Sequence, residues 1–281
     1  MERLNGWRLK SDALHQAARN SHRRLTSWGV DGRTTLSALR GFKAARNDRK
    51  TFRSQREVSD SPLEFPDGDS YFIYQDRWDS AGVATGHYFH QDLLVARDIF
   101  DKKPRRHVDV GSSIYGFVSH VASFREIDVL DIRPLDADIP GIRFFQQDVL
   151  QLDELWRGVT DSASCLHALE HFGLGRYGDA IDYDGWRKGL ANLVGLLEPG
   201  GVLYLGLPTS NRQRVEFNAH RIFSLPHLRD FLAESLEIER LAFITDAGDL
   251  LTDVDPFGKD AENSFRADYG CSVWVLRKPW A

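Results

Sequence analysis

Three carboxylates lie at positions where the parallel strands of a sheet would end. Asp109 lies in the first of three apolar runs, Asp131 ends the second, and Asp148 follows the third. A turn of small residues begins at Gly111, 20 residues before Asp131. Glycine lets a ligand approach the backbone, and an acid at the tip of the next strand accepts hydrogen bonds from ribose hydroxyls. The pattern therefore predicts a nucleoside site.

We expect the three acids to have different partners. Asp131 suits the two hydroxyls of a ribose, whereas Asp148, which Gln147 precedes, suits the amino group of an adenine. Asp109 is expected either to orient the turn at Gly111 or to face the ammonium group of a ligand through water.

Alternating strand and helix patterns must position these acids. The expected strands are residues 106–110, 126–131, 142–146, 162–167, 202–207, 238–245 and 271–276, and the expected helices are 88–100, 117–124, 183–197 and 225–235. Such alternation predicts an α/β domain with a mostly parallel sheet that is covered on both faces. In these sheets ligands bind beyond the carboxyl ends of the strands.

Charge is distributed unevenly along the chain. Residues 1–57 contain 14 Lys/Arg and 5 Asp/Glu, a balance of +9, whereas the whole chain carries −5. We therefore expect a basic N-terminal arm and linker over residues 1–69, with short irregular helices followed by a turn-rich segment. The acidic body, residues 70–281, is expected to begin with a short strand at 71–74.

A basic arm can contact an anionic surface, such as lipid, glycan or phosphate, or the acidic face of a partner protein. The alternative is that the arm is solvated or docks on its own chain. The pI of about 6.1 and the absence of a specific nucleic-acid-binding motif argue against a dedicated nucleic-acid-binding protein.

Composition and cysteine content favour a reducing compartment. No apolar run approaches the roughly 18 residues that span a bilayer, and the polar, basic N-terminus lacks the apolar centre of a signal peptide. Cys165 and Cys271 lie in apolar runs, which predicts two buried free thiols, with a disulfide between them as the alternative. We expect a cytoplasmic protein, peripheral at the inner membrane face if its arm binds lipid.

These features resemble the class I S-adenosylmethionine-dependent methyltransferases over about residues 87–277. The resembling segments are 108–111, 131, 147–148, 165–171 and 197–203. A closer resemblance is to an uncharacterised family of short methyltransferase-like proteins found near bacterial polysaccharide genes, through residues 87–92, 109–113, 167–179 and 216–221. The resemblance implies a doubly wound, Rossmann-like sheet of seven strands that binds S-adenosylmethionine.

The cofactor site that the resemblance implies includes the loop after the first strand. Its implied residues are Asp109, Gly111, Ser112, Ser113, Asp131, Gln147, Asp148 and His167. The class usually has a second glycine where this chain has Ser113, and Gly116 comes one residue late. A side chain there crowds the methionine end of the cofactor, but serine is small, so we expect binding to survive.

The polar segment after the fifth strand is expected to face an acceptor. Methyl transfer to a hydroxyl needs a base with a pKa near neutral and an in-line approach to the sulfonium. The catalytic candidates are therefore His220, Glu216 and His171. The candidate acceptor-binding residues are Asn218, Arg221, Arg176 and Tyr177, with residues 173–184 as a lid. The alternatives are a hydrogen-bonded loop that holds the edge of the domain, and packing of His171 under the cofactor.

We expect O-methylation of a small-molecule acceptor, a sugar or glycan intermediate, and the glycan class rests on the usual setting of the resembling family. One alternative is a non-catalytic scaffold with the same fold. The other is a metal-dependent hydrolase, because residues 167–171 read His-x-x-Glu-His. That motif needs a helix with both histidines on one face, and here it begins at the end of a strand, so we expect no metal site.

Overall fold

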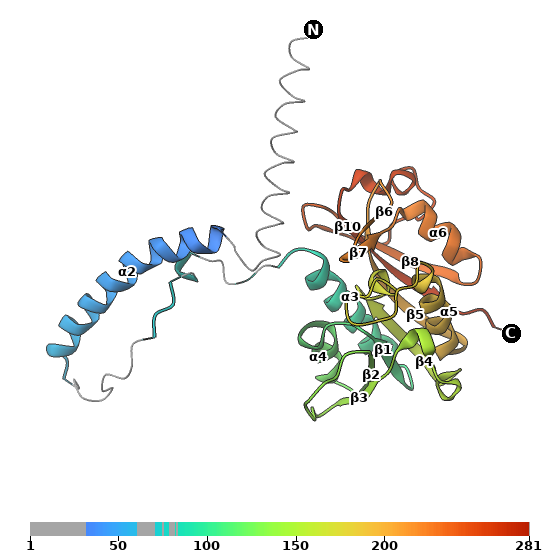
Figure 1. The fold of residues 1–281 in the computed structure, drawn as a ribbon, viewed down its shortest axis with the longest axis horizontal. Coiled ribbons are helices and arrows are strands. Elements are labelled where there is room, and N and C mark those ends of the chain that lie inside the picture. Colours follow the sequence, from blue (N-terminus) through green and yellow to red (C-terminus); the bar gives the residue numbers. More distant parts are fainter. Residues whose placement is uncertain (1–31, 61–70, 75, 79–81, 83, 281) are drawn as a thin grey trace, which may run out of the picture. The chain divides into compact units, whose positions relative to one another are not determined.

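The computed structural model describes residues 32–60, 71–74, 76–78, 82 and 84–280. It divides into two units, Met1–Gly82 and Val83–Ala281 (Figure 1). Residues 1–31 of the expected arm and residues 61–69 of the expected linker lie outside the described residues. The expected domain boundary between residues 69 and 70 stays a prediction.

The first unit contains one long helix where short irregular helices were expected. This helix, α2 (Gly32–Glu57), has 26 residues and is rich in Arg, Ala and Lys, which are good helix formers. A Cβ atom on Gly41 would lie 1.8 Å from the carbonyl oxygen of Tyr74, so glycine lets the following segment lie against the helix. Residues 71–74 form no strand, which makes that expectation wrong, and a short helix, η1 (Asp76–Trp78), follows them.

The second unit contains the sheet and its covering helices. Its strands are β1 (His107–Val110), β2 (Ile127–Asp131), β3 (Ile142–Gln146), β4 (Thr160–Leu166), β5 (Leu197–Thr209), β6 (Arg214–Glu216), β7 (His220–Ile222), β8 (Glu237–Ile244), β9 (Leu250–Leu251) and β10 (Gly270–Arg277). Its longer helices are α3 (His87–Lys102), α4 (Ser119–Ala122), α5 (Gly185–Leu196) and α6 (Leu225–Ala233). Its short helices are η2 (Ile114–Val118), η3 (Val149–Gln151), η4 (Glu154–Trp156), η5 (Leu169–His171) and η6 (Ala261–Arg266).

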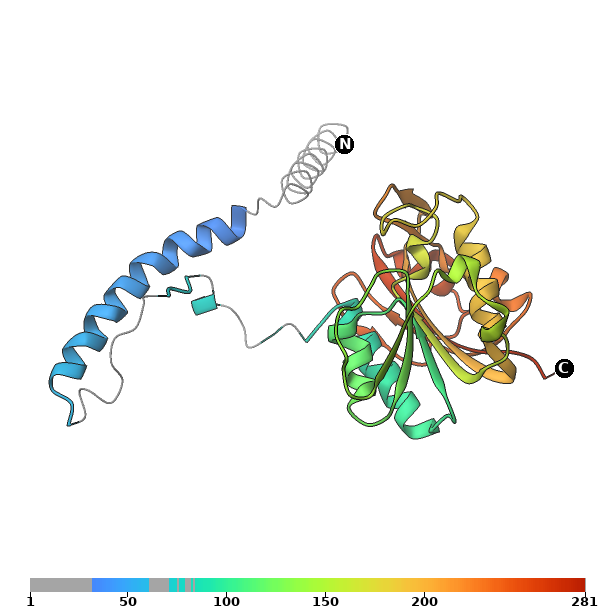
Figure 2. The same cartoon turned by 60° about the horizontal axis from the view of Figure 1, so that its bottom comes forward.

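The main sheet has the order β3-β2-β1-β4-β5-β10-β8-β9, and β6 pairs with β7 in a separate hairpin. Strands β1 to β5 run parallel to one another, whereas β10 lies antiparallel between β5 and β8. Helices α3 and α4 cover one face of the sheet, and α5 and α6 cover the other (Figure 2). Each pair of helices encloses a separate apolar core against the sheet. The strand order reverses between β1 and β4, which is the usual place for a ligand in such a sheet.

The expected α/β architecture with a largely parallel sheet is confirmed. The sheet has eight strands rather than seven, because the two-residue strand β9 pairs with the edge strand β8. The expected helix 117–124 is replaced by η2 and α4, with non-helical backbone at Gly116. The polar segment 216–221 lies in the β6–β7 hairpin. Cys165 and Cys271 are buried and free, as expected.

Within the described ranges, no helix is both long enough and apolar enough to cross a bilayer.

Asp109 fixes the turn after β1. Its carboxylate is fully buried and accepts hydrogen bonds from the amide (3.1 Å) and hydroxyl (2.6 Å) of Ser112 and from the hydroxyl of Ser164. The Ser112 hydroxyl accepts in turn from the amide of Leu166 at 3.1 Å. Burial raises the pKa of Asp109 to about 7, although the bonds from Ser112 and Ser164 act against it. Because Ser164 and Leu166 both belong to β4, the carboxylate of Asp109 in β1 holds the turn against β4.

Asp109→Ala should lower the free energy of unfolding by about 2–5 kcal/mol, because it leaves one amide and two hydroxyls buried without an acceptor, at roughly 1–3 kcal/mol each. Urea unfolding followed by circular dichroism measures the change. The matched control is Asp136→Ala at an exposed carboxylate, which should stay within about 0.5 kcal/mol of wild type. Equal stability of Asp109→Ala and wild type would contradict the role given to this network.

Candidate functional site

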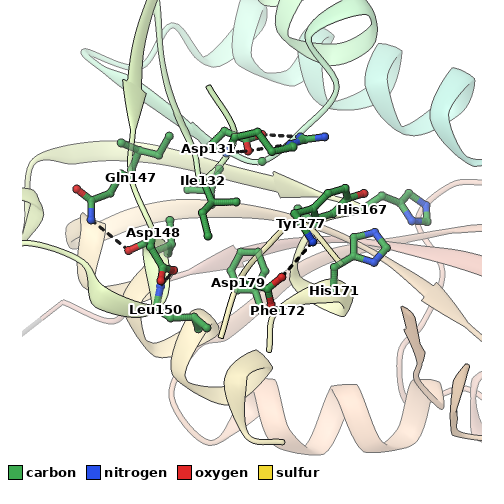
Figure 3. A pocket seen from close by; sticks show the side chains of 16 residues that line it. Asp131, Ile132, Gln147, Asp148, Leu150, His167, His171, Phe172, Tyr177 and Asp179 are labelled. Carbon is green, nitrogen blue, oxygen red and sulfur yellow. Dashed lines mark hydrogen bonds and ion pairs between the residues drawn. The ribbon is translucent and has the colours of Figure 1, made fainter. Parts of the chain in front are cut away.

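A cleft of about 540 Å³ lies at the carboxyl ends of the strands that flank the reversal (Figure 3). The expected site residues that line it are Gly111, Asp131, Gln147, Asp148, His167, His171 and Tyr177. Much of the remaining wall is apolar and includes Ile132, Leu150 and Phe172. A largely apolar cleft with a few convergent polar groups is the common form of a small-molecule site.

Asp131 ends β2 with both of its carboxylate oxygens engaged. Arg133 donates to Oδ1 from its backbone amide and its Nε, both at 2.9 Å, and to Oδ2 from Nη2 at 2.5 Å. The same guanidinium lies 4.6 Å from the centre of the Tyr177 ring. The Asp131 side chain is 10% exposed and that of Arg133 is 46% exposed, so the arginine is the partner that has room to move. A ligand that uses Asp131 has to displace or share Arg133.

Gln147 and Asp148 form the wall of the cleft that follows β3. Asp148 precedes η3, and its side chain accepts from the amide of Leu150 at 2.9 Å. The Gln147 side-chain amide donates to the Asp148 carbonyl at 3.1 Å. Both residues therefore have local partners, while their side chains still line the cleft (Figure 3).

Gly111 forms the opposite wall, where the turn approaches β4 closely. Its φ is +70°, in the left-handed region that favours glycine, and an added Cβ would lie 2.9 Å from the Cβ of Ala168. Asp109 and Ser112 lie beneath this turn and not in the cleft, so the geometry matches the orienting role for Asp109. Ser113 lines an adjoining groove that shares Gly111 and Asp131 with the cleft.

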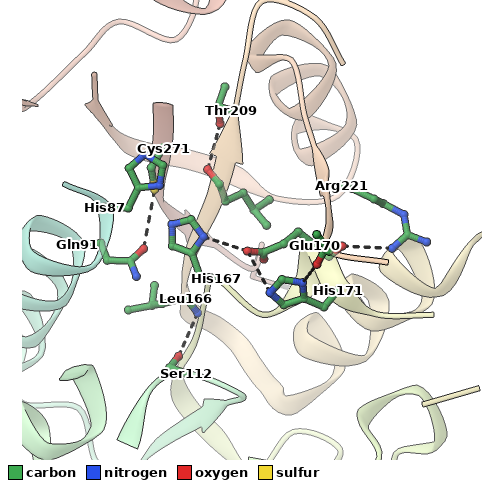
Figure 4. Close-up of polar contacts among 12 residues, drawn as sticks. His87, Gln91, Ser112, Leu166, His167, Glu170, His171, Thr209, Arg221 and Cys271 are labelled. Atoms are coloured by element: carbon green, nitrogen blue, oxygen red, sulfur yellow. Dashed lines mark hydrogen bonds and ion pairs between the residues drawn. The ribbon is translucent and has the colours of Figure 1, made fainter. Parts of the chain in front are cut away.

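Glu170 lies among histidines beside the cleft (Figure 4). Its buried Oε1 lies 2.9 Å from Nδ1 of His167 and 3.6 Å from Nε2 of His171. Burial acts to raise the pKa of Glu170, but the hydrogen bond with His167 holds it below its usual value. Burial acts to lower the pKa of His167, but Cys271 and Glu170 raise it well above the usual value. His167 and Glu170 therefore behave as a buried ion pair.

His171 and His220, two of the expected catalytic residues, lie next to one another with ring centres 6.4 Å apart. His171 donates Nδ1–H to the carbonyl of Ala219 at 2.6 Å and lines the cleft, which His220 does not. The buried Nε2 of His220 lies 3.5 Å from the third candidate, Glu216, and forms no hydrogen bond within the part of the chain that the structure describes. Burial lowers the pKa of both histidines, which keeps them neutral at pH 7.

Arg221 holds the segment that was expected to be a lid. Its buried guanidinium donates to the backbone carbonyls of Glu170, Phe172, Asp182 and Tyr183. Asp179 organises the same segment from inside by accepting from the amides of Gly173, Gly175 and Tyr177. These bonds commit Arg221 to the segment rather than to an acceptor.

The other expected acceptor residues lie around the rim. Nη1 of Arg176 donates to the carbonyl of Ala219 at 2.9 Å, and its guanidinium lies 5.1 Å from the centre of the Tyr177 ring. Asn218 is exposed in the turn between β6 and β7. The cleft wall includes Tyr177 but neither Arg176 nor Asn218.

Residues that the sequence did not single out complete the site. Arg133 follows Asp131 by two residues, and this spacing of opposite charges after a strand is a signal that could have revealed the pair. His87 stacks on His167 with ring centres 5.2 Å apart and planes within 6°. In the sequence, the only signal for His87 is its place in segment 87–92, one of the segments that resemble the methyltransferase-like family. Tyr269, which contacts both His87 and His220, carried no sequence signal.

Comparison of the sequence with family models gives one match. Residues 144–262, less than half of the chain, match DUF268, a family described as a Caenorhabditis protein of unknown function. A comparison with curated protein sequences found no match.

Comparison with solved structures finds methyltransferases at low identity. The N-methyltransferase NodS from Bradyrhizobium japonicum, in complex with S-adenosyl-L-homocysteine, is 13% identical over 82% of this chain and 97% of its own, with a TM-score of 0.45. The 1,6-didemethyltoxoflavin-N1-methyltransferase from Burkholderia thailandensis is 16% identical over 85% and 90%, with a TM-score of 0.47. An O-methyltransferase from a trans-AT PKS multienzyme of Brevibacillus brevis is 14% identical over 68% and 71%, with a TM-score of 0.48. The strand order of this chain defines its fold independently of these likenesses.

Arg221→Lys should loosen the segment 172–183, because one ammonium cannot reach the four carbonyls that the planar guanidinium joins. Amide hydrogen exchange in this segment should speed up roughly tenfold or more, in line with about 1–3 kcal/mol for lost buried bonds. The control is Arg187→Lys, at an arginine that is 44% exposed and contacts Asp184 at 3.7 Å and the rings of Trp186 and Phe231. Unchanged exchange in Arg221→Lys would show that other contacts hold the segment.

Proposed function

We propose that this chain is an S-adenosylmethionine-dependent methyltransferase that acts on a hydroxyl oxygen of a small-molecule acceptor, a sugar or glycan intermediate. One observation carries the proposal. A glycine turn, an acid at the end of β2 and an acid after β3 line one cleft at the reversal of strand order. This is the arrangement in which nucleoside ligands bind to doubly wound sheets.

The residues of the cleft fit an adenosyl group. Asp131 offers two oxygens to a ribose diol once Arg133 moves, and the Asp148 side chain and its neighbour Gln147 offer polar atoms to an adenine edge. Ile132, Leu150 and Phe172 supply apolar wall for the faces of the base. Gly111 lines the cleft, and its lack of a Cβ lets the turn lie close to Ala168.

The two neutral histidines support acid–base chemistry beside this cleft. When bound, S-adenosylmethionine supplies an electrophilic methyl group, and the protein has to remove the proton of the attacking hydroxyl. Nδ1 of His171 is committed to the Ala219 carbonyl and its Nε2 faces Glu170. Nε2 of His220 lies 3.5 Å from the Glu216 carboxylate, which favours a proton on Nε2 and leaves Nδ1 as the accepting nitrogen. We assign the His220–Glu216 pair as the base and His171 as the residue that positions the cleft wall.

The acceptor class is the part of the proposal that rests on resemblance alone. Arg176, Tyr177 and Asn218 lie near the cleft rim and offer hydrogen-bonding groups of the kind that bind sugar hydroxyls. A screen of sugar and other hydroxyl acceptors that follows release of S-adenosylhomocysteine tests this class directly. Within α2 many arginines and lysines are exposed, and we propose that this arm contacts an anionic surface or partner.

The ion pair between Arg133 and Asp131 favours a second candidate function, a scaffold that keeps the fold without the cofactor. In that case the pair is a permanent part of the wall. Calorimetry with S-adenosylhomocysteine distinguishes the two, because the scaffold binds nothing and the enzyme binds one equivalent.

Asp131→Ala should weaken S-adenosylhomocysteine binding by at least about tenfold, since hydrogen bonds to a charged group contribute roughly 1.5–3 kcal/mol. Isothermal titration calorimetry measures the dissociation constant, and circular dichroism checks that the fold is retained. Asp138→Ala, at an exposed acid, is the matched control and should bind like wild type. An unchanged constant in Asp131→Ala would remove the ribose assignment.

Methyl transfer should stay level near pH 7 and lose rate only at a pH below the ordinary range of an imidazole, because burial lowers the pKa of His220 and its ring must be neutral to accept a proton. His220→Gln should lower kcat roughly a hundredfold or more, the usual size of a general-base contribution. The measurement is the pH profile of kcat with an acceptor from the screen. An acid limb that persists in His220→Gln would assign the base elsewhere.

A further inference from the structure

Three metal-binding side chains converge from distant parts of the second unit. One ring nitrogen each of His87 and His167 and the sulfur of Cys271 lie within 4.8 Å of one another (Figure 4). His87 begins α3, His167 follows β4, and Cys271 lies in β10. Among the residues that the structure describes, this is the group in which three such donors come together. It differs from the His-x-x-Glu-His pattern, because it uses only one residue of that string.

Each histidine already has an outer partner for one of its two nitrogens. Nδ1 of His167 contacts Oε1 of the buried Glu170 at 2.9 Å, and Nε2 of His87 lies 3.2 Å from the Tyr269 carbonyl. Carboxylates and carbonyls of this kind typically orient a metal-binding imidazole and leave its other nitrogen for the ion.

The Nε2 atom of His167 is the strongest single sign of a ligand. Its side chain is 3% exposed, and Nε2 is buried with no hydrogen bond within the described residues. Buried polar atoms are nearly always paired, so an orphaned one that faces two further donors calls for a partner. A metal ion satisfies it by replacing the Nε2 proton, while the Nδ1–H bond to Glu170 stays in place.

We infer that His87, His167 and Cys271 bind a divalent transition metal, with zinc the best match. Two imidazoles and one thiolate are a donor set that zinc favours. Zinc bonds of about 2.0–2.3 Å in a tetrahedron place donor atoms roughly 3.4–3.8 Å apart, so the observed group has to close by about 1 Å. Side-chain rotation supplies this movement, because His87 is only partly buried.

A fourth ligand position remains. The buried side-chain oxygen of Gln91 lies 3.9 Å from the Cys271 sulfur, so this amide is a candidate to complete the set. Three protein ligands with an exchangeable fourth position are typical of zinc sites that take part in chemistry, whereas four protein ligands are typical of structural sites. The metal also connects the start of α3 to β4 and β10.

The test uses the full chain purified under reducing conditions without chelator. Elemental analysis should find about one zinc per chain. After removal of zinc, titration with Co²⁺ should produce a thiolate-to-cobalt charge-transfer band that saturates at one equivalent. Cys271→Ser should abolish this band, whereas Cys165→Ser, at the other buried thiol, should keep it.

Two further variants keep the inference testable if Cys271→Ser does not fold. His87→Ala should weaken Co²⁺ affinity at least about tenfold, and Glu170→Gln should weaken it by about 10–100-fold through the orientation of His167. Absence of stoichiometric zinc or cobalt in the wild type overturns the inference, and so does a band that survives in Cys271→Ser. Both readouts are independent of S-adenosylhomocysteine, whose binding is measured separately, so failure of the metal site and failure of the proposed function are distinguishable.

Discussion

The arrangement of the cleft depends on one buried carboxylate. Asp109 accepts three hydrogen bonds from Ser112 and Ser164, and Ser112 accepts one more from the backbone of Leu166. These bonds fix the turn at Gly111 against the end of β4, which is where His167 and the histidine cluster begin. A carboxylate without exposure can be held only if its oxygens are satisfied, so the spacing of the turn and of β4 is set by chemistry as well as by packing.

The sheet could be predicted because its strands are apolar runs that end in turn residues. The segments around Val108, Val129 and Leu205 are buried on both faces of the sheet, and the sequence shows this as continuous hydrophobicity. Two features carried no such signal. Strand β9 has two residues, too few for any periodicity, and α2 lacks an apolar stripe although its residues favour a helix.

Part of the site was predictable from the sequence. Residues placed by strand topology could be predicted, whereas residues brought together by packing could not. Asp131 and Asp148 follow strands directly, so topology alone places them at one edge. Arg133 follows Asp131 by only two residues, so their pairing depends on local geometry that the spacing of opposite charges could have indicated. The group of His87, His167 and Cys271 was beyond reach, because its members meet only through the packing of α3 and β10 on the sheet. Arg221 was expected at an acceptor, but its position against four carbonyls depends on the path of the segment 172–183.

His167 belongs to two environments at once. One part of its ring contributes to the wall of the cleft, while its nitrogens face Glu170 and the cysteine side of the domain. Any occupant on one side changes the orientation or protonation of a ring that the other side also uses. A ligand in the cleft and a metal ion on the cysteine side would therefore be coupled. By thermodynamic reciprocity, each would change the affinity for the other by the same factor and in the same direction.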